Sequence, residues 1–233
     1  MSLQLARKKL RRIASKKKAR TLRSFFKTKP GQYAAGDVFI GVTVPAIRRI
    51  ARDAHSLSLS DIGTLLHSRI HEERLLALII LVARYERGDS KTQKEIFTFY
   101  LAHSRKVNNW DLVDLSAPKI VGDYLFKRKR DVLHRLIRSG NLWDRRIALV
   151  STHSFIKRND IRETLRLSRL VLRDSEDLIH KAAGWMLREA GKVNMCALED
   201  FLERHAGRMP RTMLRYALEK SSPAKRKYFM QKK

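Results

Sequence analysis

Along most of the chain, apolar residues recur every three or four positions, the spacing of one face of an α-helix. Thr43 followed by Pro45 predicts a helix start, because proline is accepted in the first helical turn. The apolar face of that helix would be Val44, Ile47, Ile50 and Ala51. Gly, Asp, Asn and Ser residues predict breaks between further helices, at 88–90, 139–141 and 159–160. No alternating strand pattern with hairpin turns is present, so we expect an all-α chain.

A repeat organises the middle of the chain. Four octets can be aligned, HEERLLAL, VNNWDLVD, LWDRRIAL and LIHKAAGW, which begin at residues 71, 107, 142 and 178 and are therefore 36, 35 and 36 residues apart. This period is typical of paired helices stacked as a solenoid, close to HEAT and armadillo repeats. We therefore expect a right-handed solenoid of HEAT-like antiparallel helical pairs, with a long concave groove.

The net charge of the chain indicates which class of molecule the groove would bind. The chain has 51 Lys and Arg against 23 Asp and Glu, a net charge of +28, which attracts polyanions. Nucleic acid and an anionic membrane surface both fit this charge. The longest apolar run, Leu75–Ala83, is far shorter than the ~20 residues of a membrane span, and no apolar stretch follows the basic N-terminus as in a signal peptide. We expect a basic groove that binds nucleic acid, and no membrane partner.

Composition also indicates the organisation of the chain. Residues 1–29 hold 12 Lys and Arg and no acid, and are expected to be helical or partly disordered. They are either a solubilising helix or an arm on phosphates. Residues 30–220 would form the repeat domain, and 221–233 a basic tail. Cys196 is the sole cysteine, which excludes an intramolecular disulfide and favours a reducing, cytoplasmic location; we expect a monomer.

The octet alignment brings polar and aromatic residues into register. Trp110 and Arg145 occupy its fourth position, Arg146 its fifth, and Asp114 and Trp185 its eighth. The fourth and eighth positions lie on one face of a helix, so successive repeats would direct these residues to a common surface. Each has a structural alternative, since a tryptophan often packs in a core and an aspartate can pair with a buried arginine.

These residue types favour work on nucleic acid. A carboxylate beside two indoles can stabilise a cation or position a water molecule, and indoles pack against sugars and bases. An arginine binds phosphate through its forked donors. Trp143 lies off this face and is expected in the core. His67 and His71 have a spacing that can bind metal, but no third ligand is evident, so we expect neither metal nor cofactor.

Four segments resemble DNA alkylation repair glycosylases of the AlkD type. Residues 109–114 (NWDLVD) resemble the W-D-L-V-D motif of that family. Residues 142–149 and 182–189 (AAGWMLRE) resemble its following arginine and tryptophan motifs, and residues 36–49 (GDVFIGVTVPAIRR) its opening repeat. The resemblance spans residues 36–192 with the order preserved, which is more specific than any single motif. The additional Lys and Arg at both ends have no counterpart in it.

The resemblance implies a HEAT-like glycosylase that excises positively charged N3- and N7-alkylpurines from double-stranded DNA in base excision repair, without base flipping. Asp114 would be the catalytic carboxylate, Trp110 and Trp185 would pack on the deoxyribose, and Arg146 would bind phosphate, with the adjacent Arg145 as the alternative. Two other functions remain open: a non-catalytic HEAT-repeat binder of damaged or structured nucleic acid, and a HEAT-type scaffold for acidic proteins. The combined Trp, Asp and Arg set favours the glycosylase.

Overall fold

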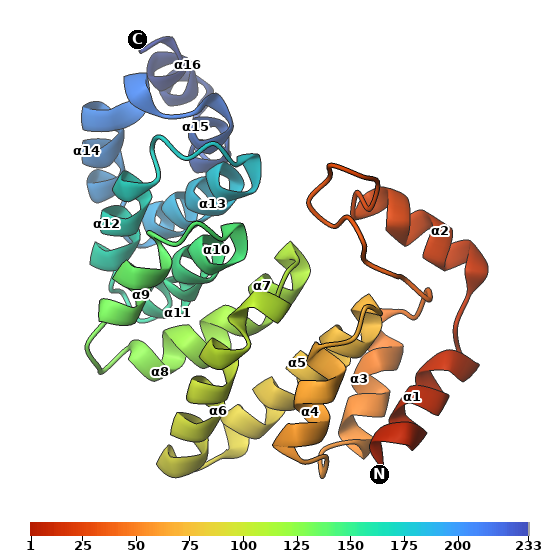
Figure 1. The fold of residues 1–233 in the computed structure, drawn as a ribbon. Helices are drawn as coiled ribbons and strands as arrows, with labels where there is room; N and C mark the ends of the chain where they lie inside the picture. The colour runs from red at the N-terminus through yellow and green to blue at the C-terminus, as the bar shows by residue number, and fades with distance from the viewer. Residues whose placement is uncertain (233) are drawn as a thin grey trace. The chain divides into compact units, whose positions relative to one another are not determined.

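The computed structural model describes residues 1–232, and every regular element within them is a helix (Figure 1). The β-type pairing in this range is limited to an isolated bridge between Val38 and Ile70. The all-α expectation is therefore confirmed. Contacts between Cα atoms divide the chain into two compact units, Met1–Ser116 and Ala117–Lys233.

Unit 1 is built around the long helix α5, against which α1, α3, α4 and α6 pack. Its elements are α1 (Leu3–Arg12), α2 (Lys16–Phe25), α3 (Val44–Asp53), α4 (Leu59–Leu66), α5 (His71–Arg87), α6 (Ser90–Ala102), the 3₁₀ turn η1 (Ser104–Lys106) and α7 (Trp110–Ala117). Nearly every residue of the first three turns of α5 is buried, which explains why this helix carries the longest apolar run of the sequence.

The basic N-terminal segment forms two helices, α1 and α2. Serine side chains cap both of them, with Ser2 accepting a hydrogen bond from the Leu5 amide and Ser15 one from the Lys18 amide. Ala6 and Leu10 are fully buried on one face of α1, and the Arg7 Nε donates to the buried Glu73 carboxylate over 2.9 Å. Residues at the start of the chain are thus part of the packed structure of unit 1.

A loop between α2 and α3 is held by one buried acid, Glu72. Its carboxylate accepts hydrogen bonds from the backbone amides of Ile40, Gly41 and Val42, at 2.7–3.3 Å. Gly41 has a φ of +82°, and a Cβ there would lie 2.2 Å from the backbone oxygen of Ser15 at the start of α2. The loop can approach α2 this closely because residue 41 has no side chain.

Unit 2 is organised around a second long helix, α13, which packs against α10, α12, α14 and α15. Its elements are the π-helical turn η2 (Pro118–Gly122), α8 (Asp123–Leu125), α9 (Asp131–Leu136), α10 (Leu142–Ser151), α11 (His153–Ile156), α12 (Arg162–Leu170), α13 (Asp177–Val193), α14 (Met195–His205), η3 (Ala206–Arg208), α15 (Arg211–Ala217) and α16 (Pro223–Gln231). Gly184 lets α15 cross α13 closely, because a Cβ at this glycine would lie 2.4 Å from the Met213 oxygen.

The predicted helix starts and breaks agree with these elements. Helix α3 begins directly after Thr43, and the octets at residues 71, 142 and 178 begin within one residue of α5, α10 and α13. The remaining octet begins three residues before α7. Asp89 and Asn141 cap α6 and α10, and Asn159 has a positive φ of 62° before α12. The repeat spacing therefore located the starts of α5, α10 and α13, while the solenoid arrangement and its groove remain predictions.

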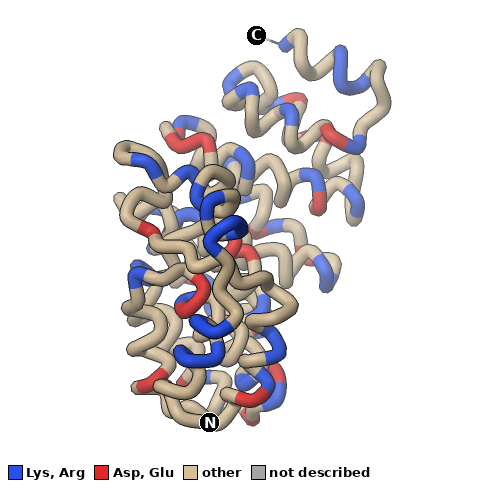
Figure 2. The backbone as a smooth tube through the Cα atoms, turned by 90° about the vertical axis from the view of Figure 1, so that its right-hand side faces the viewer, with Lys and Arg blue, Asp and Glu red and all other residues tan. Residues whose placement is uncertain are grey.

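Lys and Arg occur along the helices of both units and are not confined to the chain ends (Figure 2). Many of the acids, in contrast, are buried or paired with a basic side chain; Glu73, Asp160 and Asp174 are examples. The positive charge consequently dominates the exposed surface. None of the helices in the described residues is long and apolar enough to cross a membrane.

Candidate functional site

Helix α7 carries the two motif residues of unit 1. The buried Asn109 precedes this helix, and its side-chain oxygen accepts a hydrogen bond from the Trp110 amide over 2.8 Å, which fixes where the helix begins. Trp110 is the first residue of α7 and Asp114 follows one turn later; both side chains are half-buried. The structure therefore brings the predicted carboxylate and the first predicted indole to the same helix face.

The Trp110 ring is positioned by aromatic residues at the end of α2 and in the loop that follows it. Phe26 stacks on it with a centroid separation of 5.2 Å and an interplanar angle of 20°, and Phe25 meets it edge-on at 5.8 Å. The indole nitrogen donates a hydrogen bond to the Tyr33 hydroxyl over 3.2 Å. The Trp110 ring is therefore both packed against neighbouring side chains and partly exposed. Residues 25–33 hold it in place.

A buried charged network lies directly beside Trp110. His71, at the start of α5, is 2% exposed, and its Nε2 contacts the Asp111 carboxylate over 2.8 Å. Its Nδ1 lies 3.5 Å from the Asp37 carboxylate, which also pairs with Arg74 over 2.7 Å. Arg74 in turn donates to the backbone oxygen of Ser68 over 2.8 Å. This network ties the loop before α3, the start of α5 and the start of α7 together.

The network determines which of its members carry charge. Burial alone would lower the pKa of His71, but its contacts with Asp111 and Asp37 outweigh burial and raise that pKa above 6.5. Burial alone would raise the pKa of Asp37, but the contacts with His71 and Arg74 lower it. The neighbouring carboxylates thus favour the protonated form of His71, and His71 and Arg74 favour the charged form of Asp37.

Sequence reasoning did not identify this network. It treated His71 only in relation to His67, whose ring instead lies against His103 at 5.5 Å and whose Nδ1 contacts the Gly63 oxygen over 2.9 Å. Two features of the sequence pointed to the network. One is the run of four charged or titratable residues, HEER, at the start of an otherwise apolar helix. The other is Asp111 inside the NWDLVD segment.

Unit 2 holds the predicted arginine pair on α10, where the two side chains have different environments. Arg145 forms a two-pronged ion pair with Asp174, at 2.7 and 3.2 Å, and its side chain is 14% exposed. Arg146 is 5% exposed and donates a hydrogen bond over 2.6 Å to the backbone oxygen of Leu178, at the start of α13. Of the two, Arg145 lies nearer to solvent, whereas Arg146 joins α10 to α13.

Trp185 lies on α13 and is half-buried. Its ring is 5.6 Å from that of His153, and it packs beside the apolar cluster that contains Ile156 and Met186. Burial and the nearby charge of Lys157 lower the pKa of His153, so this histidine is neutral at pH 7. Trp143 is 7% exposed, which confirms the expectation that it belongs to the core.

Comparisons with known proteins identify the family. Residues 6–221 match the model of a family described as DNA alkylation repair enzyme. The chain belongs to this DNA alkylation repair family. A solved structure described as a "Predicted DNA alkylation repair enzyme from Enterococcus faecalis" is similar, with a TM-score of 0.71 and 16% identity, covering 90% of this chain and 97% of that chain. No curated protein matches the chain.

The family match covers most of both units, from residue 6 in α1 to residue 221, and includes all the predicted site residues. It gives DNA as the substrate and repair of alkylation damage as the process. The solved relative shares the fold at an identity too low to transfer residue roles.

Proposed function

We propose that this member of the DNA alkylation repair family is a DNA glycosylase. Its substrates are positively charged N3- and N7-alkylpurines in duplex DNA, and it hydrolyses their N-glycosidic bond without flipping the damaged base into a pocket. The observation that carries the proposal is the half-buried Asp114 on α7, one turn from a half-buried, positioned Trp110, within a chain of this family.

The reaction needs little beyond electrostatic stabilisation. When the bond between the sugar C1′ and the purine nitrogen breaks, both electrons stay with the purine, whose positive charge is thereby neutralised. The sugar becomes an oxocarbenium-like cation, which the Asp114 carboxylate and the Trp110 ring stabilise. Water then adds to C1′ and loses a proton to Asp114 or to solvent. The products are the free alkylpurine and an abasic site in the DNA.

Two carboxylates in the NWDLVD segment could take this role, and their environments differ. One oxygen of Asp111 contacts His71 over 2.8 Å, and the other accepts from the Leu112 amide over 2.9 Å. Asp111 is therefore committed to the buried network. Asp114 holds the corresponding position of the family motif, and we assign the catalytic role to it.

The residues of unit 2 have supporting roles in this proposal. Trp185 packs on the deoxyribose of the lesion, and an arginine on α10 contacts the DNA backbone. Greater exposure supports Arg145 for that contact, whereas Arg146 is nearly buried and bonded to Leu178. To reach a phosphate, Arg145 would exchange the Asp174 carboxylate for the phosphate oxygens, which offer the same two-pronged geometry.

The test is release of free base from duplex DNA that carries one N7-methylguanine. Wild-type protein is expected to release N7-methylguanine well above the spontaneous rate, and Asp114→Asn to reduce the rate about 100-fold or more, because one preorganised electrostatic group is removed. Glu95→Gln is the matched control, since Glu95 is an exposed acid on α6 and its substitution also removes one negative charge. It is expected to keep the wild-type rate.

Three results would count against the proposal. Base release no faster than the spontaneous rate would leave a non-catalytic DNA binder or a protein scaffold. Equal release by wild-type protein and Asp114→Asn would remove Asp114 from its assigned role. An equal loss in Asp114→Asn and Glu95→Gln would attribute the effect to overall charge.

A further inference from the structure

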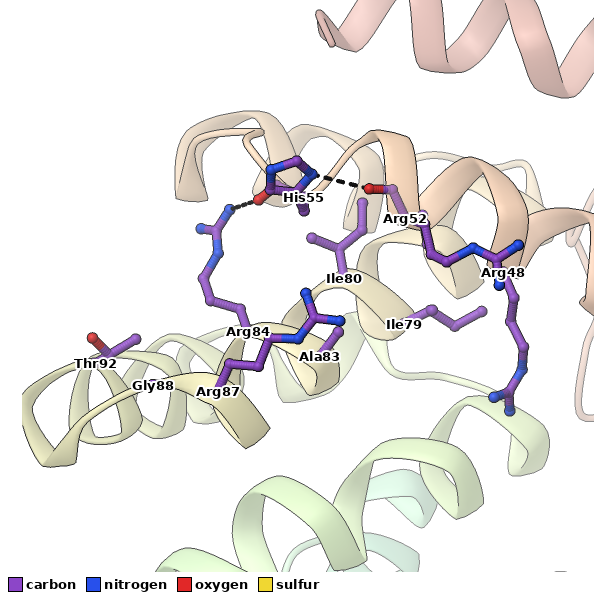
Figure 3. Close-up of a pocket in the computed structure, with 11 residues that line it drawn as sticks. Arg48, Arg52, His55, Ile79, Ile80, Ala83, Arg84, Arg87, Gly88 and Thr92 are labelled. Atoms are coloured by element: carbon purple, nitrogen blue, oxygen red, sulfur yellow. Dashed lines mark hydrogen bonds between the residues drawn. The ribbon is translucent and has the colours of Figure 1, made fainter.

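Unit 1 contains a second feature that the proposed glycosylase function does not use. A cavity of about 440 Å³ opens between α3 and α5 (Figure 3). Its volume lies within the range of pockets that hold small organic ligands. The residues that line it are Arg48, Ala51, Arg52, His55, Ile79, Ile80, Ala83, Arg84, Arg87, Gly88 and Thr92.

Four arginines and no acid line this cavity. Arg84 is held in place, because its guanidinium donates to the backbone oxygens of His55, over 2.9 Å, and of Leu57. Within the described residues, the side chains of Arg48, Arg52 and Arg87 form no hydrogen bond or ion pair. The neighbouring acid, Asp53, is paired with Lys9 over 2.6 Å. Arg52 interacts electrostatically with Asp53, but no acid lines the cavity, which therefore concentrates positive charge that an anionic ligand would relieve.

The floor of the cavity is aliphatic. Ile79, Ile80 and Ala83 on α5 present apolar side chains between the guanidinium groups (Figure 3), and Ala51 on α3 also lines the cavity. An inorganic phosphate would gain nothing from this surface. A ligand that combines several negative charges with a flat apolar body would use both parts of the cavity, since the body can cover the aliphatic residues while the charges pair with arginines.

The cavity is separate from the Trp110 site. Arg84 lies 13 residues after His71 on the same helix, which corresponds to about 20 Å along the axis of α5. The residues that line the cavity include none of the residues assigned to catalysis or to the buried network. A ligand can therefore occupy the cavity without touching the candidate catalytic residues.

We infer that this cavity binds a nucleotide, with the phosphate groups on Arg48, Arg52 and Arg87 and the base on the aliphatic floor. A nucleoside triphosphate has the required chemistry, because its phosphates carry several negative charges and its base is a flat ring system. Arg84 serves as a fixed donor at the inner edge. The inference is independent of the proposed glycosylase activity.

The experiment is a binding titration of the full chain with a fluorescent N-methylanthraniloyl derivative of ATP, without DNA. Arg48→Ala and Arg87→Ala are each expected to weaken binding about tenfold, the effect of losing one hydrogen bond to a charged group. Arg49→Ala is the matched control. Arg49 is also an exposed arginine on α3 but does not line the cavity, and its variant is expected to bind within about twofold of wild type.

Competition defines the ligand class. Unlabelled ATP is expected to displace the probe at least tenfold more effectively than inorganic tripolyphosphate, because only ATP covers the apolar floor. Equal displacement by tripolyphosphate would overturn the nucleotide assignment in favour of a simple anion site. Equal weakening by Arg49→Ala would show non-specific attraction to a protein of charge +28. Displacement by a 5′-phosphorylated oligonucleotide at lower concentrations than ATP would make the cavity a DNA contact.

Discussion

Gly41 lies where the loop before α3 passes the start of α2, and its replacement by alanine tests how that loop is held. The backbone at residue 41 has a φ of +82°, a conformation that costs a residue with a Cβ about 1–2 kcal/mol. Gly36 provides the matched control. Its φ is +87°, but no atom lies within 4 Å of the position that a Cβ would take. Gly36→Ala therefore measures the conformational cost alone.

At Gly41 a steric cost is added. The new Cβ would lie 2.2 Å from the Ser15 oxygen and 2.6 Å from the Ala19 nitrogen, and both are backbone atoms that cannot rotate away. The loop must then move from α2. It would lose the 2.9 Å hydrogen bond from the Ser15 amide to the Ile40 oxygen, about 1 kcal/mol, and weaken the amide bonds to Glu72, at about 1.5–3 kcal/mol each. We expect Gly41→Ala to cost at least about 4 kcal/mol in total.

The free energies of unfolding of wild type, Gly36→Ala and Gly41→Ala can be compared by urea denaturation at pH 7. Gly36→Ala is expected to lose about 1–2 kcal/mol, and Gly41→Ala at least about 2 kcal/mol more. A difference between the two variants below about 0.5 kcal/mol would refute the close approach of the loop to α2.

Two further predictions concern the charged residues. The pKa of His71 is raised in the folded protein, so the contribution of this residue to the free energy of unfolding is complete below pH 6.5 and is lost as the pH rises through the folded pKa. His71→Gln should remove the resulting decline in the free energy of unfolding with rising pH. An unchanged decline between pH 6 and 9 in this variant would assign it to another group. Arg145→Ala should lower the slope of log binding constant against log salt for duplex DNA by about 1. Arg146→Ala should leave this salt slope unchanged and cost about 2–3 kcal/mol in the free energy of unfolding, because Arg146 is buried and bonded to Leu178. A lower slope in Arg146→Ala together with an unchanged slope in Arg145→Ala would make Arg146 the phosphate contact.

Local features of the sequence predicted much of the fold. The spacing of apolar residues gave the helical class, and the caps Asp89 and Asn141 marked where α6 and α10 begin. These features act within one helical turn, so their physical effect can be evaluated from neighbouring residues. The NWDLVD segment and its companions likewise led to the family, because a motif is a property of the sequence itself.

Contacts between distant residues could not be predicted in this way. His71 meets Asp111 across 40 positions, and Arg48 and Arg84 line one cavity from two helices. No local pattern specifies such pairs, since they depend on how α3, α5 and α7 pack. The same holds for Arg145 and Arg146, which are adjacent in sequence but differ in their surroundings.

By itself, then, the sequence determined that this protein is helical, where its long helices begin, how strongly it is charged and which family motifs it carries. Tertiary structure decided that the aspartate next to Trp110 is committed to His71, that Arg145 and not Arg146 lies nearer to solvent, and that four arginines surround an aliphatic floor. The physical reason is that helix formation depends on neighbours within one turn, whereas exposure and pairing depend on the elements that pack against each side chain.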